Sequence, residues 1–165
     1  MFLCFCPGCL SSIFSLKKSN HDSQMQTIME MYSHYRKDFP SIKEITVTEL
    51  LEMQSNLPVT LVDIRGENER AVSMIPGAIS ESEFEAVKNN LINQPIVIYC
   101  TIGYRSGLYT KKITAQGYDV RNLIGGILAW TNSKQKLIHN GNSTKNVHVY
   151  GSKWNILPEG YTGMW

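Results

Sequence analysis

The chain of 165 residues is long enough for one globular domain with a substantial core. Hydrophobic residues make up 42% of it and charged residues 18%, a balance that excludes disorder throughout. The net charge of +2 carries little information, and no basic segment interleaved with aromatic residues is present. We therefore expect a globular protein that does not bind nucleic acid.

Residues 1–20 form an apolar, cysteine-rich stretch that we expect to be an extension of the domain. Its uncharged part is shorter than the about 20 apolar residues of a transmembrane helix. Lysines follow this part, whereas a secretory signal carries its positive charge first. One hypothesis is S-acylation of the crowded cysteines, with the lysines meeting anionic lipid at a membrane surface. The candidates are Cys4, Cys6 and Cys9.

Other interpretations of this cysteine cluster stay open. A targeting segment, or an extension that does not fold with the domain, would have the same composition. A metal site formed by the thiolates lacks an evident fourth ligand, so we expect none. The remaining cysteine, Cys100, stands alone in the rest of the chain, which argues against a disulfide framework and for a reducing compartment. We expect an intracellular protein tethered to a membrane through its N-terminus, with an organelle such as the mitochondrion as the alternative.

Residues 21–40 carry an amphipathic pattern that predicts a helix or helical linker ending before Pro40. The apolar positions recur at the spacing i, i+3, i+4, i+7, which places them on one helix face. Such a stripe is typical of packing, so we expect it to dock on the domain. The residues are Ile28, Met31, Tyr32 and Tyr35.

Strands and helices alternate through residues 42–130, which we expect to be the domain itself. The expected strands cover residues 45–47, 59–62, 96–99 and 120–123. One helix is expected after an N-cap at Thr48, and another after the capping box formed by Ser80 and Glu83. In the second helix Phe84 and Val87 are expected to point inward. This alternation predicts an α/β fold with a parallel sheet and helices on both faces.

Cys100 follows an apolar run, residues 96–99, that reads as a strand buried on both faces. In an open α/β sheet ligands bind at the carboxyl ends of the strands. Backbone N–H groups of the turn and of the next helix favour a thiolate there. Gly103 permits a positive φ angle, Arg105 offers a planar fork to oxyanions, and Ser106 is a candidate helix cap. A buried core cysteine is the alternative, and these neighbours disfavour it.

The segment from Cys100 to Ser106 resembles the active-site loop of the rhodanese family. Two further segments are similar to the family's other signatures and occur in the family's order. The resemblance covers roughly residues 42–130 and implies a three-layer α/β/α fold with a central, mostly parallel sheet, here with an N-terminal extension and a C-terminal tail. The similar segments are Leu61 to Arg65 with Glu69 and Ile75 to Ile79, and Gly117-Tyr118, Asn122-Leu123 and Gly125 to Trp130.

The resemblance implies a sulfurtransferase that needs no cofactor. In that hypothesis the Cys100 thiolate takes the outer sulfur of thiosulfate, or of a related small anionic donor, and passes it from a persulfide to cyanide or a thiol. Arg105 would orient the donor, while Asp63 and Arg65 would support the site through hydrogen bonds. Mercaptopyruvate and a protein persulfide are alternative donors. The loop residues expected to hold the persulfide are Thr101, Ile102, Gly103, Tyr104 and Ser106.

Two other functions were weighed against this one. A cysteine-dependent phosphatase needs five residues between its cysteine and arginine, but here four residues separate Cys100 from Arg105. The smaller ring suits a sulfur atom better than a tetrahedral phosphate. A rhodanese-like module that binds or senses sulfur or redox state without turnover remains the main alternative.

Residues 131–165 form a C-terminal extension that we expect to pack on the domain. Its lysines form a basic segment that is typically a solvated face. Asn140-Gly141 predicts a turn, and residues 147–150 alternate like an edge strand. Within that strand His148 is expected to be a surface residue, with a role as acid or base at the site as the alternative. The aromatic residues expected to cover the domain are Trp154, Tyr161 and Trp165.

Overall fold

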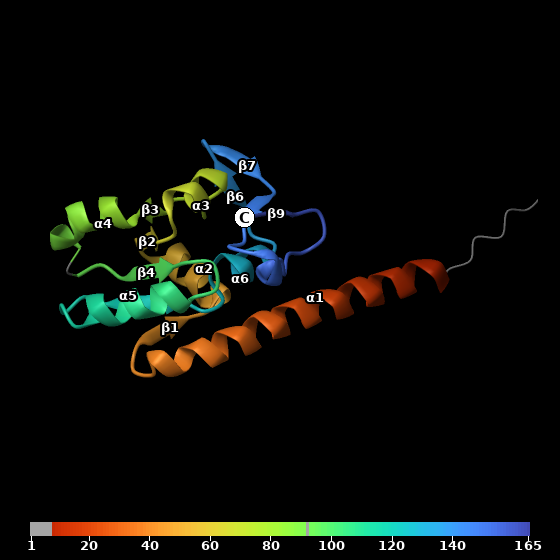
Figure 1. Cartoon of the computed structure of the whole chain (residues 1–165), viewed down its shortest axis with the longest axis horizontal. Coiled ribbons are helices and arrows are strands. Elements are labelled where there is room, and N and C mark those ends of the chain that lie inside the picture. Colours follow the sequence, from red (N-terminus) through yellow and green to blue (C-terminus); the bar gives the residue numbers. More distant parts are fainter. Residues whose placement is uncertain (1–7, 92) are drawn as a thin grey trace, which may run out of the picture.

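A computed structural model describes the backbone of residues 8–91 and 93–165, and the side chains of residues 22–91 and 93–165. A five-stranded sheet lies in the middle of the molecule with helices around it (Figure 1). A long helix, α1 (Gly8–Tyr35), passes along the domain, and the C-terminal tail gathers near one end of the sheet.

The sheet has the order β1-β5-β4-β2-β3, and every neighbouring pair in it is parallel. The predicted parallel sheet is thereby confirmed. The strand expected at residues 45–47 lies two residues earlier, because Thr46 leaves the strand to cap the next helix. The strands are β1 (Lys43–Ile45), β2 (Thr60–Asp63), β3 (Ile79–Ser80), β4 (Ile96–Tyr99) and β5 (Val120–Leu123).

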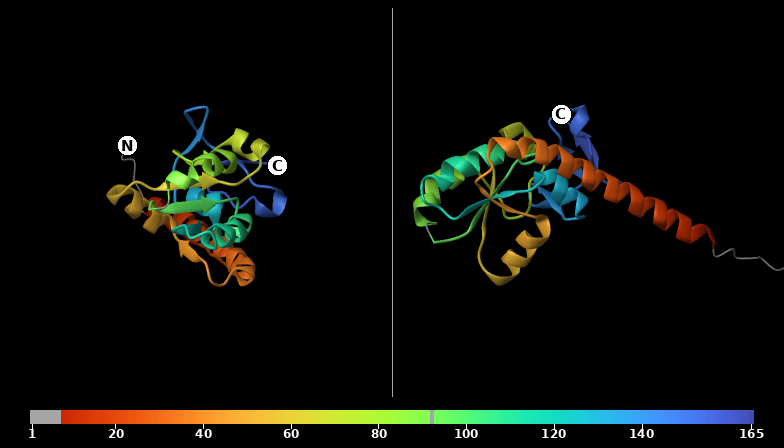
Figure 2. Two further views of the ribbon diagram at one scale, coloured as in Figure 1. Left: turned by 90° about the vertical axis from the view of Figure 1, so that its left-hand side faces the viewer. Right: turned by 90° about the horizontal axis from the view of Figure 1, so that it is seen from below.

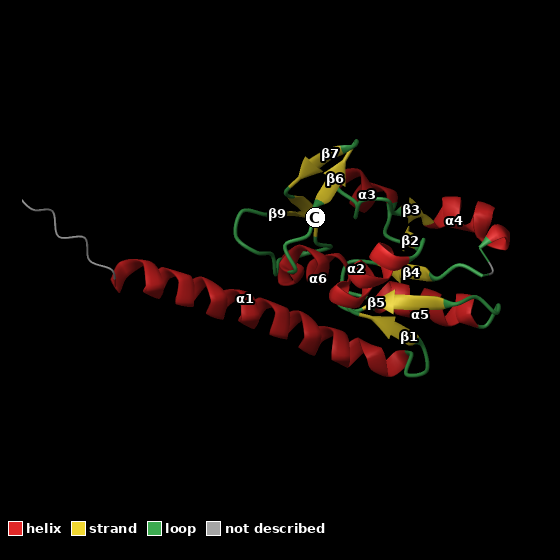
Figure 3. Cartoon of the chain, turned by 180° about the vertical axis from the view of Figure 1, so that it is seen from behind, coloured by secondary structure: helices red, strands yellow, loops and turns green. Residues whose placement is uncertain are grey.

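The central strand β4 separates two hydrophobic cores, as its alternating side chains show. Ile96 and Ile98 join one core, and Val97 and Tyr99 join the other. Helices α4 (Glu81–Val87) and α5 (Tyr104–Thr114) pack into the first core, whereas α2 (Val47–Asn56) and α6 (Gly126–Asn132) pack into the second (Figure 3). The expected α/β/α layering is confirmed.

The helix starts agree with the sequence patterns only in part. The capping box of Ser80 and Glu83 is confirmed at the start of α4. The cap of α2 is Thr46, so the prediction of Thr48 was wrong. Thr46 has the extended backbone of a cap, and its side chain accepts a hydrogen bond from the backbone amide of Glu49. Val87 is 41% exposed instead of inward-facing, because α4 ends there.

Helix α1 begins earlier than predicted, at Gly8, and ends at Tyr35 before the short 3₁₀ turn η1 (Arg36–Asp38). Its C-terminal half lies on the domain, where Ile28 and Tyr32 are buried, while its N-terminal half projects beyond the domain (Figure 2). Among the residues that the structure describes, no helix combines the length and apolarity needed to cross a bilayer.

The C-terminal tail contains two small strand pairs. β6 (Leu137–His139) and β7 (Asn142–Thr144) form a hairpin that turns at Asn140-Gly141, as predicted. β8 (Asn146–His148) pairs in parallel with β9 (Thr162–Met164), and η3 (Ser152–Trp154) lies between them in the chain.

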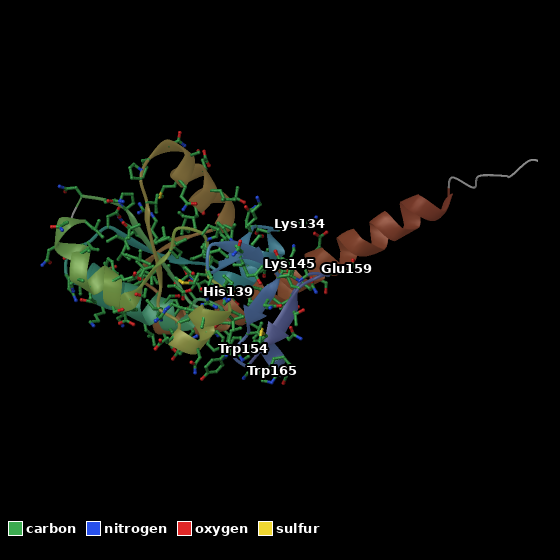
Figure 4. All side chains as sticks on the ribbon, turned by 90° about the horizontal axis from the view of Figure 1, so that it is seen from above. Lys134, His139, Lys145, Trp154, Glu159 and Trp165 are labelled. Atoms are coloured by element: carbon green, nitrogen blue, oxygen red, sulfur yellow. The ribbon has the colours of Figure 1, made fainter. Side chains whose placement is uncertain are left out.

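Trp154 confirms the expectation that tail aromatic residues cover the domain, since it is buried in the second core. Tyr161 is partly buried against the same core. For Trp165 the expectation was wrong, because its side chain is 66% exposed. Figure 4 labels both tryptophan rings. It is thus the middle of the tail, more than its last residue, that packs on the domain.

Candidate active site

Cys100 lies directly after β4, at the carboxyl end of the central strand, and is 1% exposed. It lines a pocket of about 200 Å³ that is mainly apolar. The other lining residues come from the loop after β4, from the start of α5 and from the tail. They are Thr101, Ile102, Tyr104, Arg105, Tyr150 and Trp154.

Two donors point at the sulfur of Cys100. The amide of Gly103 lies 3.2 Å from Sγ and the hydroxyl of Ser106 lies 3.5 Å from it. Gly103 is the N-cap of α5 and has a φ angle of +100°, a backbone conformation that residues other than glycine rarely adopt. Ser106 therefore lies inside α5 and donates to the sulfur from there. The prediction that it caps the helix was wrong. Both donors favour a negatively charged sulfur.

The start of α6 holds the loop that carries Cys100 through backbone hydrogen bonds. The carbonyls of Cys100 and Thr101 accept hydrogen bonds of 3.0 and 3.2 Å from the amides of Ile127 and Leu128. A Cβ atom at Gly126 would lie 2.3 Å from the Cys100 carbonyl oxygen. This close approach explains why residue 126 is a glycine.

Helix α1 holds the same loop from the side. A Cβ atom at Gly103 would lie 2.6 Å from the ring of Tyr32, so the ring rests directly on the turn. The amide of Asn122 donates to the Tyr32 hydroxyl and to the Gly103 carbonyl, at 2.9 Å each. The Tyr32 hydroxyl in turn donates to Glu44. The helical stripe thus packs as expected, and one of its residues also shapes the turn at the sulfur.

Asp63 and Arg65 form a fully buried ion pair at the end of β2, with 2.7 Å between Arg65 Nη2 and Asp63 Oδ2. Arg65 also donates to the Ser73 carbonyl at 2.6 Å, and the Tyr99 hydroxyl donates to Asp63 at 2.6 Å. Burial, with the Asp63 charge, raises the pKa of Tyr99 well above its usual value. Through the Tyr99 hydroxyl the pair joins the ends of β2 and β4, and its role in supporting the site stays a prediction.

The sequence analysis expected Arg105 to orient an anionic donor. In the structure, neighbouring residues already bind its guanidinium. Its guanidinium donates two hydrogen bonds of 2.7 Å to the Glu69 carboxylate and one of 3.1 Å to Thr101 Oγ1. Thr101 in turn donates to Glu69 at 3.1 Å. The Glu69 hydrogen bonds raise the pKa of Arg105 against the lowering effect of burial.

Glu69 is the site residue that sequence reasoning missed, although it lies in a segment that resembles a family signature. It occupies the first turn of α3 (Glu67–Val72), where the amide of Gly66 donates to its carboxylate at 2.8 Å. Burial would raise the pKa of Glu69, but the hydrogen bonds and charge of Arg105, together with the Gly66 amide, lower it to about 2. The signal in the sequence was the capping position, three residues after Gly66.

The tail completes the pocket, which the sequence did not predict. The ring of Tyr150 lies 5.3 Å from the Arg105 guanidinium carbon, and Trp154 packs at the wall of the pocket. His148, expected at the surface, has a side chain only 18% exposed, with Nδ1 4.0 Å from a Glu69 oxygen. It therefore lies beside the Glu69–Arg105 ion pair.

The predicted acylation sites lie outside this description. Cys4 and Cys6 are outside the described residues, and Cys9 is in α1 but its side chain is not described. Among the side chains of 22–91 and 93–165, no group of histidine, cysteine or acidic residues is arranged to hold a metal ion.

Comparison with known proteins identifies the family. The rhodanese-like domain family matches residues 46–133, which is just over half of the chain. The protein therefore belongs to this family. The tail residues Tyr150 and Trp154, and all of α1, lie outside the matched range.

Similar curated proteins include two bacterial enzymes. A thiosulfate sulfurtransferase GlpE from Pseudoalteromonas translucida is 31% identical over 94 residues, which cover 54% of this chain and 90% of that protein. The GlpE of Shewanella oneidensis is also 31% identical over 94 residues, covering 54% of this chain and 93% of that protein. Each match leaves nearly half of this chain uncovered.

Among solved structures, a thiosulfate sulfurtransferase from Pseudomonas aeruginosa superposes with a TM-score of 0.56 at 19% identity, covering 68% of this chain and 23% of that one. A rhodanese-related protein from Thermoplasma volcanium superposes with a TM-score of 0.51 at 21% identity, covering 58% of this chain and 97% of that one. These likenesses establish the shared fold.

Proposed function

We propose that this protein is a sulfurtransferase in which Cys100 carries the transferred sulfur as a persulfide. The observation that supports this most is the position of Sγ, at the floor of a small pocket with the Gly103 amide 3.2 Å and the Ser106 hydroxyl 3.5 Å away. Relatives with about 31% identity that bear the name thiosulfate sulfurtransferase support the same class of reaction.

The first half-reaction loads the sulfur. The Cys100 thiolate attacks the outer sulfur of a donor, and with thiosulfate the sulfur–sulfur bond breaks and sulfite leaves with the electron pair. A persulfide anion forms on Cys100 in the place where the Gly103 amide and the Ser106 hydroxyl point. Hydrogen-bond donors aimed at a developing anion lower the barrier to its formation.

The second half-reaction unloads it. Cyanide, or a thiolate, attacks the outer sulfur of the persulfide, the bond to Cys100 breaks, and the thiolate of Cys100 leaves with its electron pair. Thiocyanate or an acceptor persulfide departs, and the site returns to its first state. Asp63 and Arg65 act only as supports, because their buried pair fixes the strand ends below the loop.

A direct assay tests this function. The purified protein is incubated with thiosulfate, mercaptopyruvate or a protein persulfide in the presence of cyanide, and thiocyanate is measured over time. Thiocyanate from at least one donor, with none above background from Cys100→Ser, is the expected result. Equal thiocyanate from the Cys100→Ser protein would show that the cysteine does not carry the sulfur, and no thiocyanate from any donor would favour a binding or sensing module.

The proposal extends to location on the grounds of the sequence alone. S-acylation of Cys4, Cys6 or Cys9 would hold the enzyme at a membrane surface, with the following lysines near anionic headgroups. Replacing the three cysteines together with serine should move the protein out of the membrane fraction of its own cells and leave thiocyanate formation unchanged. A membrane fraction that stays the same would remove the tether from the account.

A further inference from the structure

The pocket over Cys100 has an aromatic wall that the family domain does not supply. Tyr104 belongs to the loop and helix after β4, but Tyr150 and Trp154 come from the tail, beyond residue 133 where the family match ends. Trp154 stacks on Tyr35 of α1, with ring centres 5.8 Å apart and ring planes 16° apart. The two segments outside the family domain therefore meet at the entrance to the site.

The charge of this pocket is already balanced. Arg105 is the one charged residue among those lining it within the described part of the chain, and Glu69 holds its guanidinium with two hydrogen bonds. Thr101 and the Tyr150 ring occupy further contacts of the same guanidinium. A dianion such as thiosulfate would have to give up water without gaining a free cation, which is unfavourable.

Tyr150 is held over the site by an unusual backbone. Its φ angle is +70°, a conformation that is rare and strained for an aromatic residue. Tyr150 as a residue is 63% exposed, so burial in the core does not explain the strain. What the conformation achieves is the placement of the ring, over Arg105 and edge-on to Trp154 with 6.4 Å between ring centres. Strained backbone of this kind is found most often at functional sites.

We propose that the sulfur partner of Cys100 is an organic sulfur compound, a thiol or its persulfide, with an apolar or aromatic group next to the sulfur, and that Tyr150 and Trp154 select it. This proposal rests on the proposed sulfurtransferase function and adds the class of its substrate. The apolar group lies between the tail rings and Tyr104 while the sulfur reaches Sγ of Cys100. Inorganic donors lack a group that can fill this space.

Thiosulfonates make a matched test, because they load a cysteine by the same chemistry with different groups attached. The thiolate attacks the outer sulfur of R–SO₂–S⁻, the sulfur–sulfur bond breaks, and the sulfinate R–SO₂⁻ leaves with the electron pair. Benzenethiosulfonate and methanethiosulfonate carry the same charge and differ in the apolar group. Persulfide formation on Cys100 is followed by intact mass after rapid quenching, with thiosulfate as the third donor.

The wild-type protein should load from benzenethiosulfonate with an efficiency at least about tenfold above methanethiosulfonate, because even one apolar group in a fitted pocket is worth that much. The comparison is expressed as the ratio of the two efficiencies, which cancels differences in active fraction. Thiosulfate should load least efficiently of the three.

Variants of the tail then assign the selection. Tyr150→Gly removes the ring and suits the positive φ angle, so it should lower the benzene-to-methane ratio several-fold. Tyr150→Phe should keep the ratio. Trp165→Ala is the control, since it removes an exposed aromatic ring of the same tail that does not line the pocket.

The outcomes separate the two proposals. Equal efficiencies for the two thiosulfonates in the wild-type protein, or an unchanged ratio in Tyr150→Gly, would overturn the substrate class and leave the sulfurtransferase in place. No persulfide from any donor would overturn the sulfurtransferase as well.

Discussion

Two arginine–carboxylate pairs lie near Cys100, and they differ mainly in their contact with water. Arg65 and Asp63 are both fully buried, whereas the Arg105 side chain is 37% exposed and that of Glu69 is 9% exposed. Both pairs have a shortest nitrogen–oxygen distance of 2.7 Å. The same chemical pairing therefore occurs once under the loop and once at the mouth of the pocket.

The difference in burial separates support from selection. A buried pair cannot lose one partner without leaving a charge in the core, so Asp63–Arg65 holds the strand ends rigidly. A pair at the pocket wall can be disturbed by a ligand or by a single substitution, so Glu69–Arg105 sets the charge that a donor meets. The predictions that follow break one pair or the other.

The largest effect is expected from breaking the buried pair. Asp63→Ala leaves the Arg65 charge without its partner and should lower the free energy of unfolding by about 3–5 kcal/mol. Urea denaturation followed by circular dichroism measures this. The control is Asp119→Ala, which breaks an exposed pair with Lys43 and should change stability by less than about 1 kcal/mol. Similar losses in both variants would contradict the distinction.

Breaking the outer pair from the arginine side should affect chemistry more than stability. Arg105→Ala removes the cation and leaves the Glu69 carboxylate without its partner beside the pocket, so repulsion of the dianion should lower the rate of loading from thiosulfate about tenfold. Rapid-quench intact mass gives the rate. Arg121→Ala, which removes a surface arginine paired with Asp119, should leave the rate unchanged. An unchanged rate in Arg105→Ala would remove the pair from the site.

Breaking the Glu69–Arg105 pair by changing Glu69 should have the opposite effect on the rate of loading from thiosulfate. Glu69→Gln keeps the shape of the side chain, removes its charge and frees the Arg105 cation, so thiosulfate loading should rise about tenfold through the weaker repulsion of the dianion. Glu67→Gln makes the same change at an exposed position of the same helix and should have little effect. Slower loading in Glu69→Gln would show that Glu69 positions Arg105 for the donor, contrary to the account.

The smallest effect is a pH dependence of stability. The pKa of Glu69 in the folded protein is about 2, below its ordinary value of about 4.5, so its stabilisation is complete above pH 4.5 and is lost as the pH falls toward 2. The stability advantage of the wild-type protein over Glu69→Gln should therefore shrink across this range. Urea midpoints measured at several pH values test it, and a constant difference would contradict the lowered pKa.

Much of the domain was predictable because its signals are local. The apolar run before Cys100 predicted the central buried strand, and the capping box of Ser80 and Glu83 predicted the start of α4. The short distance in sequence from Cys100 places Gly103 and Ser106 close to it, and both donate to the sulfur. These features depend on neighbours in the sequence.

The rest depends on contacts between distant segments, which periodicity does not encode. Arg105 meets Glu69 from another helix, and Tyr150 reaches the site from the tail after an unusual backbone turn. The ring of Tyr32 in α1 packs on Gly103 of the loop, although the two residues are far apart in the sequence. Residues that contact the site thus came from parts of the chain where the sequence indicated mainly packing or solvent.

The central claim, that Cys100 carries a sulfane sulfur, is tested most directly by peptide mass mapping. The protein is incubated with benzenethiosulfonate, alkylated, digested and analysed beside Cys100→Ser. The account predicts that the alkylated peptide containing Cys100 gains the mass of one sulfur atom, and that cyanide added before alkylation removes this sulfur as thiocyanate. A Cys100 peptide of unchanged mass, or a gain located on another residue, would contradict it.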